Sequence, residues 1–226
     1  MTNILLTGAS RGIGAACAEE LKSHNLIGTS SVDGDLADPA TPRRMWESAL
    51  ERLGGRIDVL INNAGVFEAA AVDIDHDDWV GAWERTMRIN LTAAAELCRL
   101  AVLHFREHGG GRIVNVASRA AYRGDSPAHW HYAASKAGMV GMTKSIARGF
   151  ARDNILAFAV CPGFVMTGMA DEYLASRGGD KLLADIPLGR VAQPEEVASA
   201  VRYLALEAPA SMTGAVIDIN GASFVR

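Results

Sequence analysis

Four largely apolar segments, each ended by small or turn-forming residues, constrain the fold of this 226-residue chain more than any other feature. They span Asn3–Thr7, Ile57–Ile61, Arg112–Ala117 and Ile155–Cys161, with helical patterns between them. Continuous rather than alternating apolar strands indicate a parallel sheet that helices cover on both faces. We therefore predict a doubly wound Rossmann-type α/β fold, in which ligands bind beyond the carboxyl ends of the strands. Those ends lie at Gly8, Asn63, Ser118 and Gly163.

The remaining elements follow from apolar periodicity and from helix start signals. Helices are predicted after the first strand as far as Leu21, and at Pro39–Leu53, Asp78–Phe105, His129–Phe150 and Pro194–Leu206. Two more strands are predicted at Leu26–Ser30 and Ala215–Ile219. No linker, repeat or low-complexity run divides the chain, and 49% of its residues are apolar. We therefore predict a single domain, residues 1–226.

Charge and cysteine content exclude several classes of protein. The net charge of −4 is spread without blocks, which argues against a nucleic-acid or membrane-surface partner, because either would require a basic patch. No targeting segment and no apolar run of ~18 residues is present, so no membrane span is predicted. Cys17, Cys98 and Cys161 are far apart in apolar surroundings, as is typical of reduced core cysteines in a cytoplasmic protein.

A glycine-rich turn joins the first strand to the first helix, with the sequence Gly8-Ala9-Ser10-Arg11-Gly12-Ile13-Gly14. Glycines at such a turn allow a close approach of the backbone to a ligand, and the free N–H groups of the new helix suit a pyrophosphate. The spacing G-x-x-x-G-x-G is a variant of the commoner dinucleotide fingerprint. The alternative is that the turn is only a tight connection.

Tyr132 and Lys136 lie four residues apart in a predicted helix, so their side chains point to the same side. A free phenol titrates near pH ~10, and a nearby cation favours the phenolate. Lys136 is placed to lower the pKa of Tyr132, which would make the tyrosine a general acid or base. The alternative is an exposed tyrosine beside a solvated lysine, which is common and inert.

Two histidine pairs lack the further ligands that a metal site needs, so no metal site is predicted. His104 and His108 lie near a helix end, where cationic side chains interact with the helix dipole. His129 and His131 flank Trp130 just before the tyrosine, and we expect these three residues to shape the mouth of a substrate site.

Six motifs in order resemble those of the short-chain dehydrogenase/reductase family, and the resemblance covers nearly the whole chain. They are Thr7–Gly14 (TGASRGIG), Asn62–Gly65 (NNAG), Asn90, Ser118, Tyr132 with Lys136, and Pro162–Thr167 (PGFVMT). Within this family the chain most resembles the 3-oxoacyl-acyl-carrier-protein reductase type. The resemblance implies transfer of a hydride between a nicotinamide dinucleotide and a carbonyl compound or secondary alcohol.

The resemblance also implies a role for each site residue. Tyr132 would be the general acid and base, Lys136 would lower its pKa and bind the nicotinamide ribose, and Ser118 would hold the substrate oxygen. Asn90 would hold a water that relays protons to Lys136; its alternative is an amide that caps or kinks a helix. The cofactor-binding set is Gly8, Ser10, Arg11, Gly12, Ile13, Gly14, Asp35, Leu36, Asn63, Ala64, Gly65, Tyr132, Lys136, Pro162, Gly163, Val165 and Thr167.

The chain departs from the family pattern after its second strand. Parallel neighbours need a crossover of a dozen or more residues, so no further parallel strand can form within Val32–Leu36. We predict that the usual second helix and most of the usual third strand are missing. The segment from Met166 to Arg190, expected to fold over the substrate, carries no diagnostic chemistry.

The cofactor is predicted to be NADP, with NAD possible. Asp33 and Asp35 lie near the ~20-residue distance at which an acidic residue binds the ribose of NAD. However, the second strand ends at Thr29-Ser30-Ser31, where we expect hydroxyl donors and no carboxylate. Arg11 is the nearest cation for a 2′-phosphate, and Asp35 resembles the aspartate that contacts adenine.

Two further predictions concern partners and an alternative function. Helices at Thr92–Phe105 and Ala133–Phe150 are small or apolar on nearly all sides, so one side should meet another subunit in a homotetramer or dimer. The alternative to an enzyme is a catalytically silent sensor or scaffold that binds a dinucleotide. The intact set of Asn90, Ser118, Tyr132 and Lys136 argues against it.

Overall fold

Six parallel strands form one sheet in the computed structural model, which describes residues 1–167 and 179–226. The strand order is β2-β1-β3-β4-β5-β6. The strands are β1 (Asn3–Thr7), β2 (Asn25–Thr29), β3 (Val59–Asn62), β4 (Gly111–Val116), β5 (Ile155–Pro162) and β6 (Val216–Ile219). This order confirms the predicted doubly wound α/β fold.

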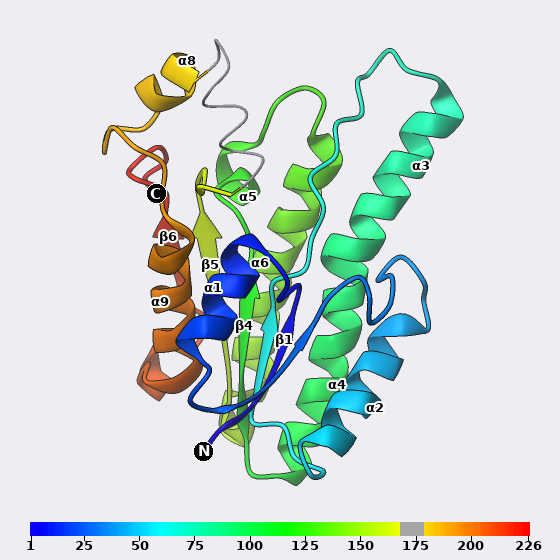
Figure 1. The fold of residues 1–226 in the computed structure, drawn as a ribbon, viewed down its shortest axis with the longest axis vertical. Helices are drawn as coiled ribbons and strands as arrows, with labels where there is room; N and C mark the ends of the chain where they lie inside the picture. The colour runs from blue at the N-terminus through cyan, green and yellow to red at the C-terminus, as the bar shows by residue number, and fades with distance from the viewer. Residues whose placement is uncertain (168–178) are drawn as a thin grey trace.

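Helices cover both faces of the sheet, with α1 and α9 on one face and α2, α4 and α6 on the other (Figure 1). The helices are α1 (Gly12–Glu20), α2 (Thr41–Arg52), α3 (His76–Met87), α4 (Ala93–Glu107), α5 (Ala120–Arg123), α6 (Trp130–Phe150), α8 (Gly179–Ala184) and α9 (Pro194–Leu206). Short 3-10 turns follow at η2 (Ala151–Asp153) and η3 (Ala210–Met212). Alternate residues of β1 show the layering, because Ile4 and Leu6 pack toward α1 and α9 while Leu5 packs toward the other layer.

Local sequence explains where several helices begin. Pro42 lies in the first turn of α2, where the missing N–H of proline costs no hydrogen bond. Asp75 caps α3 by accepting a hydrogen bond from the Asp77 N–H. Gln193 and Glu196 form a reciprocal capping box at the start of α9.

The segment between β2 and α2 confirms the predicted shortening of the fold. Residues 30–40 form turns and no helix or strand. As a result β2 is an edge strand, paired with β1 alone.

The prediction of one continuous helix over Asp78–Phe105 is wrong, because the structure divides this helical run. The helical run begins at His76 and is divided by a π-helical turn, η1 (Arg88–Thr92), which contains Asn90. Turns of this kind insert one residue into a helix and often occur at functional sites. The side chain of Asn90 bonds to the loop after β3, which gives the turn a physical reason.

The strand register brings the predicted ligand positions to one edge. Thr7 pairs with Thr29, Asn62 with Asn115, and Val116 with Val160, so these strands end together. Gly8, Asn63, Ser118 and Gly163 therefore follow strand ends at the same edge of the sheet. Of the segment 166–190 that we expected to cover the substrate, positions 168–178 lie outside the described residues.

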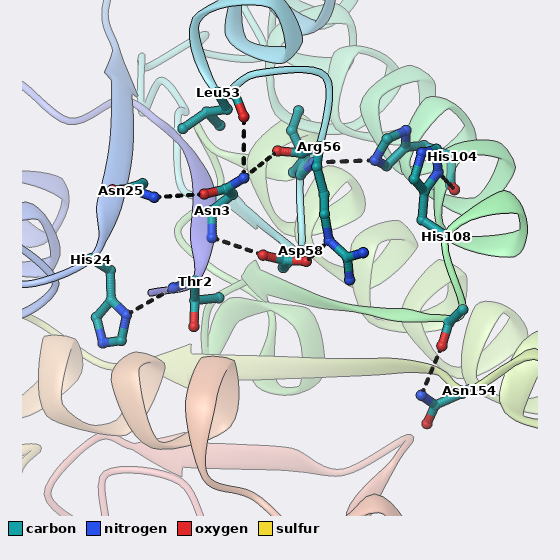
Figure 2. Close-up of polar contacts among 12 residues, drawn as sticks. Thr2, Asn3, His24, Asn25, Leu53, Arg56, Asp58, His104, His108 and Asn154 are labelled. Carbon is teal, nitrogen blue, oxygen red and sulfur yellow. Dashed lines mark hydrogen bonds and ion pairs between the residues drawn. The ribbon is translucent and has the colours of Figure 1, made fainter.

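A separate polar network lies at the amino ends of the strands, opposite the predicted ligand positions, and is drawn in Figure 2. The Asn3 N–H donates to Asp58 Oδ2 at 2.9 Å, and Asn3 Nδ2 donates to the carbonyls of Leu53 and Arg56. The Ile57 N–H donates to Nε2 of the buried His104 at 3.1 Å. Burial lowers the pKa of His104, so the cationic role that we expected for it near the helix end is wrong.

Candidate active site

Ser118, Tyr132 and Lys136 come together where β4 ends and α6 begins. Ser118 follows β4 and is buried, and its Oγ accepts a hydrogen bond from the Ala120 N–H at 3.1 Å. Tyr132 lies in the first turn of α6 and Lys136 one turn later. The ammonium Nζ of Lys136 lies 5.8 Å from the centre of the Tyr132 ring. The predicted geometry of a phenol and an ammonium on one side of a helix is therefore present.

Burial controls the protonation of both groups. Burial raises the pKa of Tyr132 to about 12, and a hydrogen bond with Ser118 acts in the opposite direction. Burial lowers the pKa of Lys136 to about 8. We expected Lys136 to lower the pKa of the tyrosine, but burial has the largest effect on that pKa and raises it, and Lys136 Nζ instead donates to the Val116 carbonyl at 2.9 Å. Tyr132 is therefore a neutral phenol that can donate a proton.

Asn90 is fully buried, and its side chain bonds to protein groups. Its Oδ1 accepts from the Val66 N–H at 2.8 Å, and its Nδ2 donates to the Val66 carbonyl at 2.9 Å and to Ser135 Oγ at 3.3 Å. Asn90 Oδ1 and Lys136 Nζ both lie beside Gly65, where an added Cβ would be 3.2 Å and 3.6 Å from them. Asn90 therefore joins the loop after β3 to the part of α6 that carries Lys136.

The glycine turn after β1 forms a cradle that other side chains would fill. Gly8 has φ +70°, and a Cβ there would lie 2.8 Å from Ala64 Cα. A Cβ at Gly14 would lie 1.9 Å from the Gly8 carbonyl oxygen. No side chain caps α1 at Arg11, so the first N–H groups of this helix face the turn. The cradle fits the pyrophosphate of a dinucleotide, which binds by close backbone approach at a helix N-terminus.

The loop after β3 is bonded to this cradle. Thr7 Oγ1 accepts hydrogen bonds from the N–H groups of Asn63 and Ala64, both at 3.1 Å. Asn63 Nδ2 donates to the Gly8 carbonyl at 2.9 Å. Leu36 is buried in a cluster against which Ala64 packs.

The segment after β5 reaches the same place. Gly163 follows Pro162 and donates its N–H to the Ile219 carbonyl at 2.9 Å. Val165 is buried and forms a bridge with Ala192. A Cβ at Gly12 would lie 3.0 Å from Thr167 Cγ2, so Thr167 lies against the glycine turn. Of the other predicted contacts, Ile13 packs on the sheet core, and Ser10 and Arg11 are exposed.

Comparison with known proteins gives the family. The family described as Enoyl-(Acyl carrier protein) reductase matches residues 23–222. A 3-oxoacyl-[acyl-carrier-protein] reductase from Thermotoga maritima is 35% identical over 96% of this chain and 95% of the relative. A 3-oxoacyl-[acyl-carrier-protein] reductase from Aquifex aeolicus is 31% identical over 99% of this chain and 88% of the relative. An uncharacterized short-chain type dehydrogenase/reductase from Sinorhizobium fredii is 31% identical over 98% of this chain and 97% of the relative.

The chain belongs to the short-chain dehydrogenase/reductase family. It is an NAD(P)-dependent oxidoreductase that acts on CH–OH groups.

The end of β2 in this short-chain dehydrogenase/reductase differs from what we predicted. Asp33 Oδ2 accepts hydrogen bonds from the Ser30 N–H at 2.7 Å and from Ser30 Oγ at 3.2 Å. The expectation that no carboxylate lies at this strand end is therefore wrong, because the turn folds back on the strand. Asp35 is exposed, and its carboxylate pairs with Arg85 at 3.5 Å.

Sequence reasoning missed one residue beside the site, Phe67. Its ring centre lies 4.8 Å from that of Tyr132. The sequence offers no signal for this contact, because Phe67 belongs to a loop without periodicity, 65 positions before the tyrosine. His129 stacks on Phe67, which places this histidine near the tyrosine, whereas His131, which we also expected at the mouth of the site, is buried.

Three results concern metal sites, membrane spans and cysteines. Within residues 1–167 and 179–226, no group of three histidine, cysteine or acidic side chains could hold a metal ion. Among the helices of the same ranges, none is long and apolar enough to span a bilayer. The three cysteines are buried and free.

Proposed function

We propose that this enzyme reduces a ketone or aldehyde to the corresponding alcohol, and oxidises the alcohol in reverse, with Tyr132 as the general acid and base. The observation that carries the proposal is the meeting of Ser118, Tyr132 and Lys136 beside the glycine cradle. In the direction of reduction, the carbonyl carbon receives a hydride and its oxygen receives the phenolic proton. A bound reduced nicotinamide supplies the hydride.

Each residue contributes a distinct part of this chemistry. Ser118 can hold the substrate oxygen near the phenol, because a hydroxyl both donates and accepts hydrogen bonds. Tyr132 is protonated at neutral pH, as a proton donor must be. The positive charge of Lys136 stabilises the phenolate that remains after the proton has left. Asn90 holds the loop after β3 in place, and the backbone of its π-helical turn is the proposed position of a relay water.

We further propose that the glycine turn binds the phosphates of the cofactor and that NADP is the preferred cofactor. Arg11 is exposed beside the turn, where a guanidinium attracts a 2′-phosphate. Asp33 opposes this preference, because a carboxylate at the end of β2 repels the phosphate and accepts from a ribose hydroxyl. Arg11 and Asp33 together therefore set the selectivity.

Relatives suggest a narrower substrate and an assembly. Two of them are named as reductases of 3-oxoacyl groups on acyl carrier protein, so a small carbonyl compound of this type is one candidate substrate. A homotetramer or dimer is proposed from α6, on which Ala137, Gly141 and Ser145 form an exposed row of small residues. Cytoplasmic location and a single domain over residues 1–226, holding both cofactor and substrate, complete the proposal.

The experiment is a turnover screen of ketones, aldehydes and secondary alcohols with NADPH, NADH and their oxidised forms. We expect carbonyl-dependent oxidation of the reduced cofactor. Tight cofactor binding with no turnover across the screen would instead support the dinucleotide-binding sensor or scaffold.

A further inference from the structure

Phe67 forms a stack of rings with His129, which directly precedes α6, and with Tyr132 in the first turn of that helix. Its ring lies on that of His129, with the centres 3.9 Å apart and the planes 4° from parallel. It meets the Tyr132 ring at 4.8 Å and an angle of 82°. The edge-to-face contact with Tyr132 is a geometry that aromatic pairs favour, and His129 covers one face of Phe67. The phenol proposed as the proton donor is therefore in direct contact with one side of this stack.

Polar contacts hold the stack in place. The Ala70 N–H donates to the Ala128 carbonyl at 2.8 Å, which joins the loop carrying Phe67 to the segment before α6. The buried His131 donates from Nε2 to the Glu68 carbonyl at 3.0 Å. Ser126 Oγ lies 2.7 Å from Nδ1 of His129. Hydrogen bonds therefore hold the loop that carries Phe67 against the start of α6 and the segment before it.

The stack still presents aromatic surface to solvent beside Tyr132. Phe67 is 40% exposed and Trp130 is 50% exposed. Trp130 in turn contacts Trp79 of α3 edge-on, at 6.1 Å between ring centres. Burial lowers the pKa of His129, which favours a neutral ring in the stack. Phe67 therefore presents exposed aromatic surface next to the Tyr132 ring.

We propose that Phe67, held by His129, determines substrate specificity by packing against an aromatic ring attached to the carbonyl carbon. This inference rests on the proposed function, because it places the carbonyl at Tyr132. A flat ring gains aromatic contact beyond the burial of its area, whereas a saturated group of the same size gains burial alone. The substrate class is thus aryl ketones and aryl aldehydes, and the matching aryl alcohols in reverse.

The test compares two ketones that differ only in the ring: acetophenone and cyclohexyl methyl ketone. The kcat and KM of each are measured for wild type, Phe67→Leu and Phe67→Tyr. Tyr203→Leu is the matched control, because Tyr203 is 37% exposed on α9 and makes no ring contact with Tyr132 among the described residues. Binding of both ketones without turnover is measured in parallel by ligand-observed NMR titration.

We expect the ratio of kcat/KM for acetophenone to that for cyclohexyl methyl ketone to fall roughly 2- to 12-fold in Phe67→Leu, mainly through KM. Phe67→Tyr and Tyr203→Leu should keep the wild-type ratio. An active Phe67→Leu enzyme with the wild-type ratio overturns the inference and leaves the proposed function intact. If no compound of the wider screen is turned over, but acetophenone binds more tightly than cyclohexyl methyl ketone in a Phe67-dependent manner, the ring-binding role of Phe67 is supported while the proposed reduction at Tyr132 fails. Absence of turnover across the wider screen, together with absence of Phe67-dependent binding, overturns both.

Discussion

Asn90 pairs with Val66 through both groups of the Val66 backbone, accepting from its N–H at 2.8 Å and donating to its carbonyl at 2.9 Å. The pair closes the loop after β3 onto the π-helical turn between α3 and α4. Gly65 lies between this contact and the Lys136 ammonium. The helix distortion and the loop after β3 therefore share a single contact, which lies beside Lys136.

Replacing Asn90 with Ala should destabilise the fold as well as the activity. The N–H and carbonyl of Val66 would lose their partners in a half-buried place, where an unpaired group costs at most about 1–3 kcal/mol. We expect the free energy of unfolding in urea to fall by roughly 2–5 kcal/mol. Asn25→Ala is the control, since Asn25 is exposed and its side chain donates a hydrogen bond to Asn3. Equal stabilities of Asn90→Ala and Asn25→Ala would contradict the structural role of Asn90.

Arg11→Ala should remove the preference for NADPH. Wild type is expected to bind NADPH more tightly than NADH. Loss of the guanidinium should weaken the binding of NADPH about tenfold, because a hydrogen bond to a charged group contributes about 1.5–3 kcal/mol. Asp33→Ser should act in the opposite direction. Dissociation constants for both cofactors check this, with Arg52→Ala on α2 as the control. A wild-type preference for NADH, or a preference for NADPH that survives Arg11→Ala, would defeat the assignment.

Gly141→Gln should weaken the proposed assembly. Gly141 is exposed on α6, and a Cβ there meets nothing within 4 Å in the single chain. A long side chain should therefore be tolerated by the monomer and should obstruct a partner subunit on this face. Gly81→Gln on α3 is the matched control, because its Cβ also meets nothing. Light scattering should give a smaller mass for Gly141→Gln alone; a monomeric wild type at micromolar concentration would contradict the assembly.

His104 should make stability depend on pH below about 6.5. Its pKa is lowered in the folded chain by burial, then by the charges of His108 and Arg56, against an opposing effect of Glu107. The unfolded chain therefore binds the proton more readily, so stability falls as pH drops through the unfolded pKa, by up to about 1.4 kcal/mol per pH unit. The neighbouring Asp58 also faces His104.

Urea unfolding at pH 7.5, 6.5 and 5.5 measures this slope. His104→Leu should be less stable at pH 7.5, because the Ile57 N–H loses its acceptor (Figure 2), and should show a shallower fall toward pH 5.5. His76→Gln, an exposed change on α3, serves as the control. An unchanged slope in His104→Leu would assign the pH dependence to other groups.

Sequence patterns predicted the sheet because buried parallel strands leave a strong signal. The four apolar segments and their end residues placed Gly8, Asn63, Ser118 and Gly163 at one edge, and the register confirms that these strand ends coincide. The shortening after β2 was predictable too, since chain length alone excludes another crossover.

Tertiary contacts account for what the sequence did not predict. Asn90 divides a helix because its side chain bonds to a loop 24 positions earlier. Asp33 reaches Ser30 because the chain turns back directly after β2. The pKa of Tyr132 depends on its burial, and Phe67 lies beside it through loop packing. None of these contacts has a period that a sequence window could detect.

The central claim is that Tyr132 donates the proton, and Tyr132→Phe tests it most directly. The variant removes one oxygen and keeps the ring that packs on Phe67. With a ketone that wild type reduces, we predict that kcat falls by about two to four orders of magnitude, while the dissociation constant for the cofactor stays within about twofold. Tyr122→Phe, which removes a hydroxyl that accepts a hydrogen bond from Arg226, should keep wild-type turnover. Near-normal turnover by Tyr132→Phe would contradict the account.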